Sequence, residues 1–154
     1  YDKGGEFRRW YGNKEYVVNF ENNGAELKNS KANLRSKHLY FKNHVTWSAL
    51  TSSSSSFRFS DYKALFDSAG SSIFLSENIF YILALMNSKI FDMVLNVINP
   101  TLNYGAGSVS LMPVINDKEK KCVVEDLALR SVNISKSDWN LYETSWDFKQ
   151  NPLL

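Results

Sequence analysis

The side chains best suited to bind another molecule lie near the start of the chain. Arg8 and Arg9 are followed directly by Trp10 and Tyr11. Guanidinium groups contact phosphates, and aromatic rings stack on nucleobases. The same four residues also fit an ordinary edge segment, in which the arginines extend to solvent over apolar surface. These residues alone leave both interpretations open.

Groups for catalysis or metal binding are sparse. His38 and His44 are six residues apart, and the single cysteine, Cys122, follows 78 residues later, which leaves a zinc site short of ligands. The sequence has no G-x-S-x-G motif and no G-x-x-x-x-G-K loop, and the G-x-G within residues 103–107 lacks the rest of a dinucleotide fingerprint. We therefore expect a binding module rather than an enzyme, with no catalytic residue and no metal site.

The basic residues are concentrated in the N-terminal third. Residues 1–45 contain nine Lys and Arg against five Asp and Glu, a local charge of +4, whereas the whole chain carries +2. The rest of the chain is therefore slightly acidic. This distribution favours an anionic partner for the N-terminal third.

The composition is that of a globular domain. Of 154 residues, 44% are hydrophobic and 22% are charged, which is sufficient for one sizeable core. A single cysteine excludes an intrachain disulfide and fits a reducing compartment. With no signal peptide and no transmembrane run, we expect a cytoplasmic protein with no membrane partner. Because the chain does not begin with Met, we also expect it to be a piece of something larger.

The elements that must position these side chains are arranged around one predicted helix at residues 76–101. Ser76 suits its N-cap, and Asn99 with Pro100 would end it, because proline has no N–H and restricts the residue before it. The apolar run is too short to span a bilayer, so we expect one long, buried core helix. The apolar positions with helical spacing are Ile79, Leu83, Met86, Ile90, Val94 and Val97.

Shorter elements are predicted on either side of this helix. Residues 25–38 fit either a short helix or a loop, and the five serines at residues 52–56 indicate a flexible loop. We expect strands at residues 15–20, 57–59, 72–75 and 109–112, and two more within residues 39–51. We expect helices at residues 117–133 and again from a capping box at residues 135–138.

The last predicted helix carries an aromatic stripe. Trp139, Tyr142 and Trp146 follow one another at positions i, i+3 and i+7. Aromatic side chains at this spacing are more typical of a docking surface than of a ligand site. They would dock either on this domain or on a missing one.

Four stretches of the chain resemble one protein family. They are residues 3–13 with 16–24, residues 44–60 with 65–74, residues 84–114, and residues 134–154. Taken together and in this order, they resemble the C-terminal half of the PglX-type adenine-specific DNA methyltransferases of BREX phage-defence systems. The resemblance covers nearly the whole chain.

The resemblance also indicates what this chain lacks. In that family the N-terminal half carries a Gly-rich S-adenosylmethionine loop and an N-P-P-[YF] motif that holds the flipped adenine. Residues 99–102 are superficially similar to the second motif, but they lack its second proline and its aromatic residue. The resemblance therefore implies that S-adenosylmethionine binds in a missing catalytic half and that this chain is the target-recognition region.

The implied fold is that of the specificity domains of TaqI-like methyltransferases and type I restriction specificity subunits. We therefore predict a mixed α/β (α+β) fold, in which a twisted, largely antiparallel sheet packs on the long buried helix. Residues 1–115 would form the target-recognition-like core. Residues 116–154 would form a helical segment that packs on this core or on a missing domain.

The implied function is recognition of the DNA sequence in which a larger enzyme methylates adenine at N6. Such a region must contact base edges in the major groove and phosphates alongside. Its expected partners are double-stranded DNA, the catalytic domain of the same polypeptide and other BREX components. The candidate DNA-binding residues are Arg8, Arg9, Lys14, Lys37, Lys42, Trp47, Ser52, Ser53 and Arg58.

A second function of a different class stays open. Trp139, Tyr142 and Trp146, with Phe148, would then dock this region on the methyltransferase half or on another defence component. In that case the chain would be a protein-interaction module with no direct contact to DNA bases.

Overall fold

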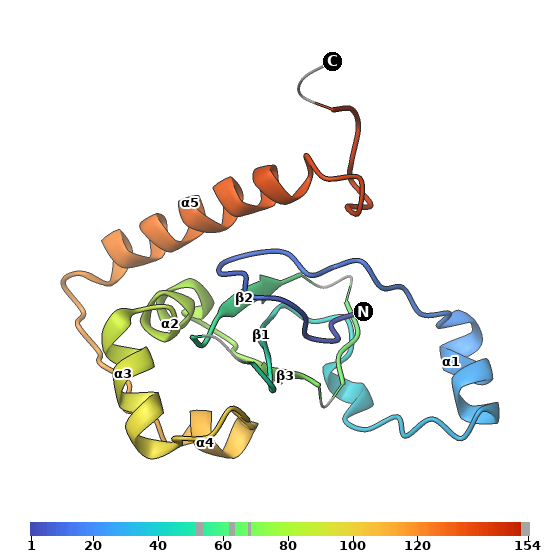
Figure 1. The fold of residues 1–154 in the computed structure, drawn as a ribbon, viewed down its shortest axis with the longest axis horizontal. Helices are drawn as coiled ribbons and strands as arrows, with labels where there is room; N and C mark the ends of the chain where they lie inside the picture. The colour runs from blue at the N-terminus through green and yellow to red at the C-terminus, as the bar shows by residue number, and fades with distance from the viewer. Residues whose placement is uncertain (52–53, 62–63, 68, 152–154) are drawn as a thin grey trace.

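A three-stranded antiparallel sheet lies at the centre of the molecule (Figure 1). The computed structural model describes residues 1–51, 54–61, 64–67 and 69–151. The strand order is β2-β1-β3, and the strands are β1 (His44–Ser48), β2 (Phe57–Ser60) and β3 (Gly70–Ile73). The predicted mixed α+β fold with an antiparallel sheet is confirmed.

One face of the sheet is apolar and packs on two helices, α2 (Ile79–Met86) and α3 (Lys89–Ile98). Trp47 pairs with Phe57 across the two neighbouring strands, so their side chains share this face. The Phe57 ring meets the ring of Phe91 on α3 edge to face, with 5.4 Å between the centroids. The hydrophobic core thus lies between the sheet and these helices.

The opposite face of the sheet is polar, yet it is also buried. The N-terminal segment, residues 1–14, covers it: Ser48 donates from Oγ to the Gly5 carbonyl over 2.9 Å, and the Asp2 N–H donates to the Leu65 carbonyl over 2.7 Å. Because this segment excludes solvent, β1 is buried at all five positions. The side chains beneath it are His44, Thr46, Ser48, Arg58 and Ser60.

The predicted single helix at residues 76–101 is wrong, because α2 and α3 meet at a bend of 68°. The hydroxyl of Ser88 caps α3 by accepting from the Phe91 N–H over 3.2 Å. The side chain of Asn87 is bonded to β2 instead of facing solvent. The predicted N-cap is also wrong, since Asn78 occupies that position. The predicted end at Asn99 is confirmed.

The C-terminal part of the chain forms α5 (Lys121–Trp139), which packs along α2 (Figure 1). The predicted restart at residues 135–138 is wrong, because α5 runs through these residues without a break. The predicted helical aromatic stripe is also wrong, because α5 ends at Trp139 and the turns that follow it contain Tyr142 and Trp146. The predicted strand at residues 109–112 is also wrong. A short helix, α4 (Ala106–Ser110), ends there, and the buried side chains Val109 and Met112 are three residues apart, which is helical spacing. The proposed division at residue 115 stays a prediction.

Besides the strand at residues 109–112, two further predicted strands are absent from the described residues. Residues 15–20 form no ladder, and Val17 is exposed there, so no partner strand satisfies their backbone groups. Within residues 39–51 only β1 forms, because Phe41 has a positive φ of 58° that interrupts extended structure. Part of the predicted flexible serine loop is instead fixed, since Ser55 is buried and donates from Oγ to Asp92 Oδ1 over 2.7 Å.

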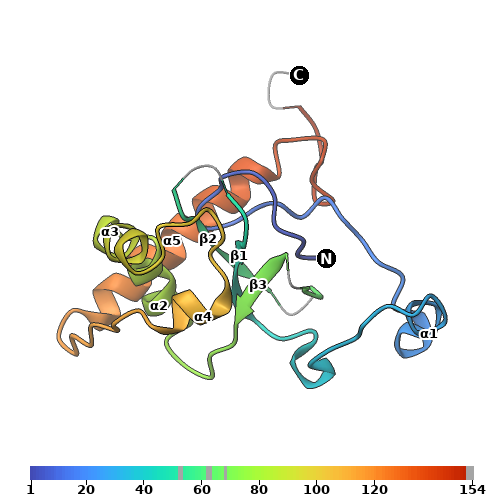
Figure 2. The same ribbon diagram turned by 60° about the horizontal axis from the view of Figure 1, so that its bottom comes forward.

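The segment between residues 1–14 and β1 extends from the sheet to α1, which lies at the end of the molecule away from α3 (Figures 1 and 2). It contains α1 (Glu21–Asn29) and a single 3-10 turn, η1 (Lys37–Leu39). Asn22, Asn23 and Gly24 have positive φ angles, so regular helix covers only the later part of α1. Among the described helices, no single one is long and apolar enough to cross a membrane; only α2 and α3 counted together, across their bend, meet that test.

A candidate nucleic-acid interface

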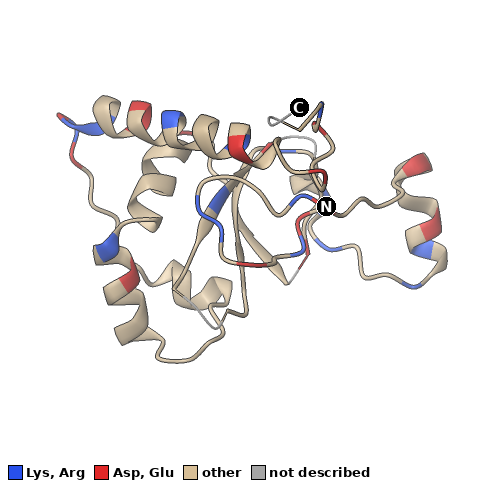
Figure 3. Cartoon of the chain, turned by 45° about the horizontal axis from the view of Figure 1, so that its top comes forward, with Lys and Arg blue, Asp and Glu red and all other residues tan. Residues whose placement is uncertain are grey.

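The segment that leads into β1 is basic and exposed. No Asp or Glu occurs between Glu26 and Asp61. We call residues 28–42 the basic arm, and Figure 3 shows its cations on the stretch between α1 and the sheet. Within the part of the chain that the structure describes, none of its five cations forms an ion pair. These exposed cations are Lys28, Lys31, Arg35, Lys37 and Lys42.

Aromatic contacts anchor the end of the basic arm that leads into β1. The Phe20 ring, just before α1, meets the rings of Tyr40 and Phe41 edge to face, at centroid distances of 5.8 and 5.2 Å. Tyr40 in turn meets Phe66 at 5.5 Å. Lys28 and Lys37 line one cavity of about 300 Å³ over these rings. The arm therefore presents positive charge from a fixed base, although its own chain is irregular.

A second group of residues joins the two ends of the chain. The Arg8 guanidinium lies 4.8 Å from the ring centroid of Trp139 and 5.3 Å from that of Tyr142. Its Nη1 also donates to Asp138 Oδ2 over 3.2 Å. Trp139 is buried in this contact, whereas Trp146 is 69% exposed. One member of the predicted docking stripe is therefore already docked on the N-terminal segment of this same domain.

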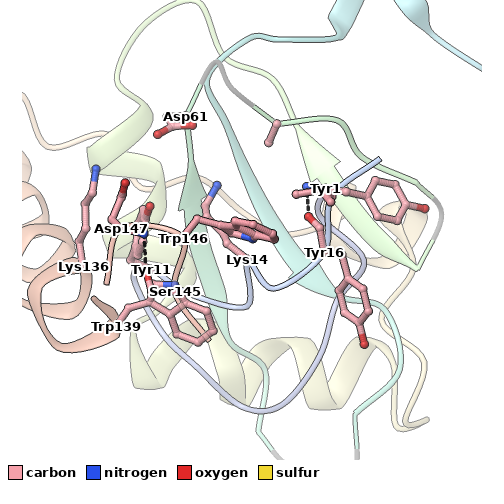
Figure 4. A pocket seen from close by; sticks show the side chains of 12 residues that line it. Tyr1, Tyr11, Lys14, Tyr16, Asp61, Lys136, Trp139, Ser145, Trp146 and Asp147 are labelled. Carbon is pink, nitrogen blue, oxygen red and sulfur yellow. Dashed lines mark hydrogen bonds between the residues drawn. The ribbon is translucent and has the colours of Figure 1, made fainter. Parts of the chain in front are cut away.

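Beside this contact lies a hollow of about 310 Å³ (Figure 4). The Lys14 and Lys136 ammonium groups lie 5.5 and 5.4 Å from the ring centroid of Tyr11. Burial, and then the carboxylates of Asp61, Asp147 and Asp2, raise the pKa of Tyr11 to about 12, so its hydroxyl is a donor at neutral pH. Tyr11 and Trp139 are both buried, so among these aromatic residues at the hollow the ring that solvent reaches most is that of Trp146.

Two of the predicted DNA-binding residues belong to the core, which corrects that prediction. Trp47 is buried, and its Nε1 donates to the Tyr104 carbonyl over 2.7 Å. Arg58 is buried beneath the N-terminal segment, where it donates to the Arg8 carbonyl and to Ser48 Oγ over 3.4 and 3.3 Å. Burial lowers the pKa of Arg58 to about 10, against the opposing charges of Asp2 and Glu15. Neither side chain reaches the surface from these positions.

The other predicted residues that the structure describes lie either in the basic arm or in the N-terminal segment. Lys37 and Lys42 are exposed in the basic arm. Arg8 is half-buried on Trp139, and Lys14 donates to Ser60 Oγ over 2.8 Å. Arg9 is partly buried above the Phe7 ring, at 5.4 Å from its centroid. Ser52 and Ser53 lie outside the described residues.

The sequence-based prediction missed three cations of the arm, namely Lys28, Lys31 and Arg35. The signal that identifies them is the absence of acidic residues between Glu26 and Asp61. A charge count over the whole N-terminal third does not show this absence, because it includes the acidic residues up to Glu26. Among the described residues, no three His, Cys, Asp or Glu side chains gather in a way that could hold a metal ion.

Comparison with known proteins identifies the class: the chain is homologous to a segment of adenine-specific methyltransferases of the BrxX and PglX kind. The predicted resemblance is thereby confirmed. The chain is 45% identical over 156 residues to the adenine-specific methyltransferase BrxX of Escherichia coli O9:H4 (strain HS). This alignment covers 99% of the chain and 13% of that protein. The chain is 35% identical over 164 residues to the adenine-specific methyltransferase PglX of Lacticaseibacillus casei (strain Zhang), which covers 100% of this chain and 14% of that protein. No family model matches the chain.

Proposed function

We propose that this chain is the DNA sequence-recognition part of a larger S-adenosylmethionine-dependent enzyme that methylates adenine at N6 in phage defence. The observation that supports this most directly is the basic arm. Five exposed cations gather there without a carboxylate between them in the sequence, in a chain homologous over its full length to adenine-specific methyltransferases. A surface of this kind attracts the phosphate backbone of DNA.

In this proposal the arm performs two tasks. Its lysines and Arg35 contact phosphates, which fixes the orientation of the chain on the duplex. Its uncharged polar side chains then lie close enough to the groove to contact base edges, and an asparagine amide matches the edge of adenine. The exposed side chains of the arm available for this are Asn29, Ser30, Asn33 and Ser36.

The remaining steps would be performed by the rest of the polypeptide. There S-adenosylmethionine binds and the target adenine is flipped out of the duplex. The proposed partners of this chain are therefore double-stranded DNA, the catalytic part of the same enzyme and other BREX components, in the cytoplasm.

A docking function is the second candidate, because two aromatic side chains in the turns after α5 are uncovered. Trp146 is 69% exposed and Tyr142 is half exposed. Trp139 is already occupied by Arg8. The first two side chains would then contact another protein surface.

Duplex binding of the chain at several salt concentrations tests the DNA proposal. The double variant Lys37→Gln, Lys42→Gln should bind more weakly, and its slope of log K against log salt should be smaller by about 1.8, since each lost phosphate contact removes about 0.9. The matched control, Lys89→Gln with Lys118→Gln, removes the same charge from exposed positions outside the arm. Equal slopes for the two double variants would overturn the proposal.

Methylation by a full-length enzyme that contains this segment tests base recognition. Residues 28–42 are replaced by the corresponding segment of another family member, with buried Arg58 left unchanged, and the methylated motif is determined by sequencing. A changed motif is expected. An unchanged motif with full activity would favour the docking function instead.

A further inference from the structure

The outer face of α3 is apolar and exposed. Ile90, Met93 and Val97 are 65, 69 and 83% exposed. They occupy positions i, i+3 and i+7 and therefore share one face of the helix. The buried side of the same helix is formed by Phe91 and Leu95. The helix thus presents a second apolar face beyond the one that the core requires.

The chain that follows α3 is also uncharged. No charged residue occurs from Met93 to Asn116, and the charges of α3 are those of Lys89 and Asp92 near its start. The rest of α3 and all of α4 are tan in Figure 3. We call this surface the apolar end. Its exposed large side chains are Ile90, Met93, Val97, Leu102, Leu111, Val114 and Ile115. The contiguous part of this surface is the α3 face of Ile90, Met93 and Val97, and exposed contiguous apolar surface marks protein interaction sites.

The exposed α3 face and α1, where the basic arm begins, lie at opposite ends of the molecule (Figures 1 and 2), whereas Arg35 of the arm lines one cavity together with Ala106 of α4. DNA binding requires cations at the contact, and residues 93–116 contain none. A membrane surface is disfavoured for the same reason, since interfacial helices carry Lys and Arg on their polar face. The chemistry of this surface instead fits an apolar, uncharged protein surface.

We propose that the apolar end docks on another part of the same methyltransferase polypeptide. The relatives extend far beyond the matched segment, which makes up 13 and 14% of their length. A surface tethered on the same chain has an effective concentration in the millimolar range, which favours it over a second copy of the protein. This inference rests on the proposed function only in that the chain works inside a longer enzyme.

Docking in this manner has a mechanical consequence. The α3 face is then held by the body of the enzyme, while the part of the basic arm next to α1 faces the duplex. The central sheet lies between these two contacts (Figure 1).

Thiol labelling of the full-length enzyme tests this arrangement. Cys122 is exposed and is first replaced by Ser, as is any other accessible cysteine of the enzyme. Val97→Cys then introduces one thiol at the apolar end, and in a second protein Ser30→Cys introduces one in the basic arm. The rate of reaction with a maleimide is measured for each native protein and divided by its rate in denaturant.

The normalised rate at position 97 should be at least tenfold lower than at position 30. Comparable rates would overturn the inference. So would protection at position 97 that disappears on dilution as a dimer dissociates, because the occupant would then be a second copy. Duplex DNA should slow labelling at position 30 and leave position 97 unchanged. If DNA does not protect position 30 while position 97 stays protected, the DNA proposal fails and the docking inference stands.

Discussion

Asp2 and His44 form a buried pair that fastens the N-terminal segment to the sheet. Asp2 Oδ2 lies 3.0 Å from His44 Nε2, and the same oxygen accepts from Ser60 Oγ over 2.5 Å. The other ring nitrogen, Nδ1, lies 2.8 Å from the Lys42 carbonyl oxygen. Both ring nitrogens of His44 therefore face oxygen acceptors, and both can donate only when each carries a proton. The pair thus links the N-terminal segment, which covers the polar face of the sheet, to Lys42 at the end of the basic arm.

This pair predicts a stability loss in acid. Burial raises the pKa of Asp2, but the hydrogen bonds from His44 and Ser60 and the charge of Lys14 outweigh it, and the pKa falls to about 2 from 3.8. A lowered pKa stabilises the fold above pH 4, and this contribution is lost as the pH falls towards 2. It amounts to about 2 kcal/mol. Chemical unfolding from pH 7 to pH 2 measures it.

The control for this prediction is Asp2→Asn. At pH 7 the variant should be less stable by about 3 kcal/mol, because a buried partner loses its carboxylate. The difference in unfolding free energy between the wild type and the variant should shrink between pH 4 and pH 2. A difference that stays constant over this range would contradict the role given to Asp2.

A second prediction concerns Asn87, whose side chain acts as a strand partner for β2. Its Oδ1 accepts from the Phe57 N–H over 3.1 Å, and its Nδ2 donates to the Phe57 carbonyl over 2.9 Å. Asn87→Ala should lower the unfolding free energy by about 3 kcal/mol, because buried backbone groups lose partners. Asn29→Ala, at an exposed position, should cost less than about 1 kcal/mol. Equal losses in the two variants would contradict this account.

The bend between α2 and α3 shows how much of the fold the sequence pattern predicts. The sequence pattern predicted one helix at residues 76–101 that Asn99 and Pro100 would end, and helix forms at Ile79–Met86 and Lys89–Ile98. Apolar spacing did not predict the bend, because spacing does not report the two interactions that accompany it. One is local, the Ser88 cap of α3, and the other is tertiary, the bond from the Phe57 N–H to Asn87, 30 residues away.

The candidate site, too, could be predicted from the sequence only in part. Local charge identified Lys37 and Lys42, which are exposed. The prediction for Arg58 failed because a strand pattern gives two faces and does not say which one solvent reaches. Here the N-terminal segment covers the polar face, and only the folded arrangement of residues far apart in sequence reveals this.

A third prediction concerns Gly12, which lies where the N-terminal segment meets α5. Its φ is +125°, and a Cβ there would lie 2.7 Å from Arg8 Cδ and 3.1 Å from Trp139 Cε3. Gly12→Ala should therefore destabilise the protein by about 1–3 kcal/mol, through backbone strain and through displacement of Arg8 from the ring. Thermal unfolding measures the loss. Gly107→Ala is the matched control, since a Cβ there meets nothing within 4 Å, and it should leave the melting temperature nearly unchanged.

The fourth prediction separates the two contacts that Arg8 makes at the end of α5. The guanidinium stacks 4.8 Å from the Trp139 centroid and pairs with Asp138 over 3.2 Å. The ion pair is partly exposed, so it should contribute about 0.5 kcal/mol, whereas stacking on a buried indole should contribute about 1 kcal/mol. Arg8→Ala should then cost more stability than Asp138→Asn, and most of its cost should persist in the Asp138→Asn background. If removing Asp138 instead abolishes the effect of Arg8→Ala, the ion pair rather than the ring holds the two ends of the chain together.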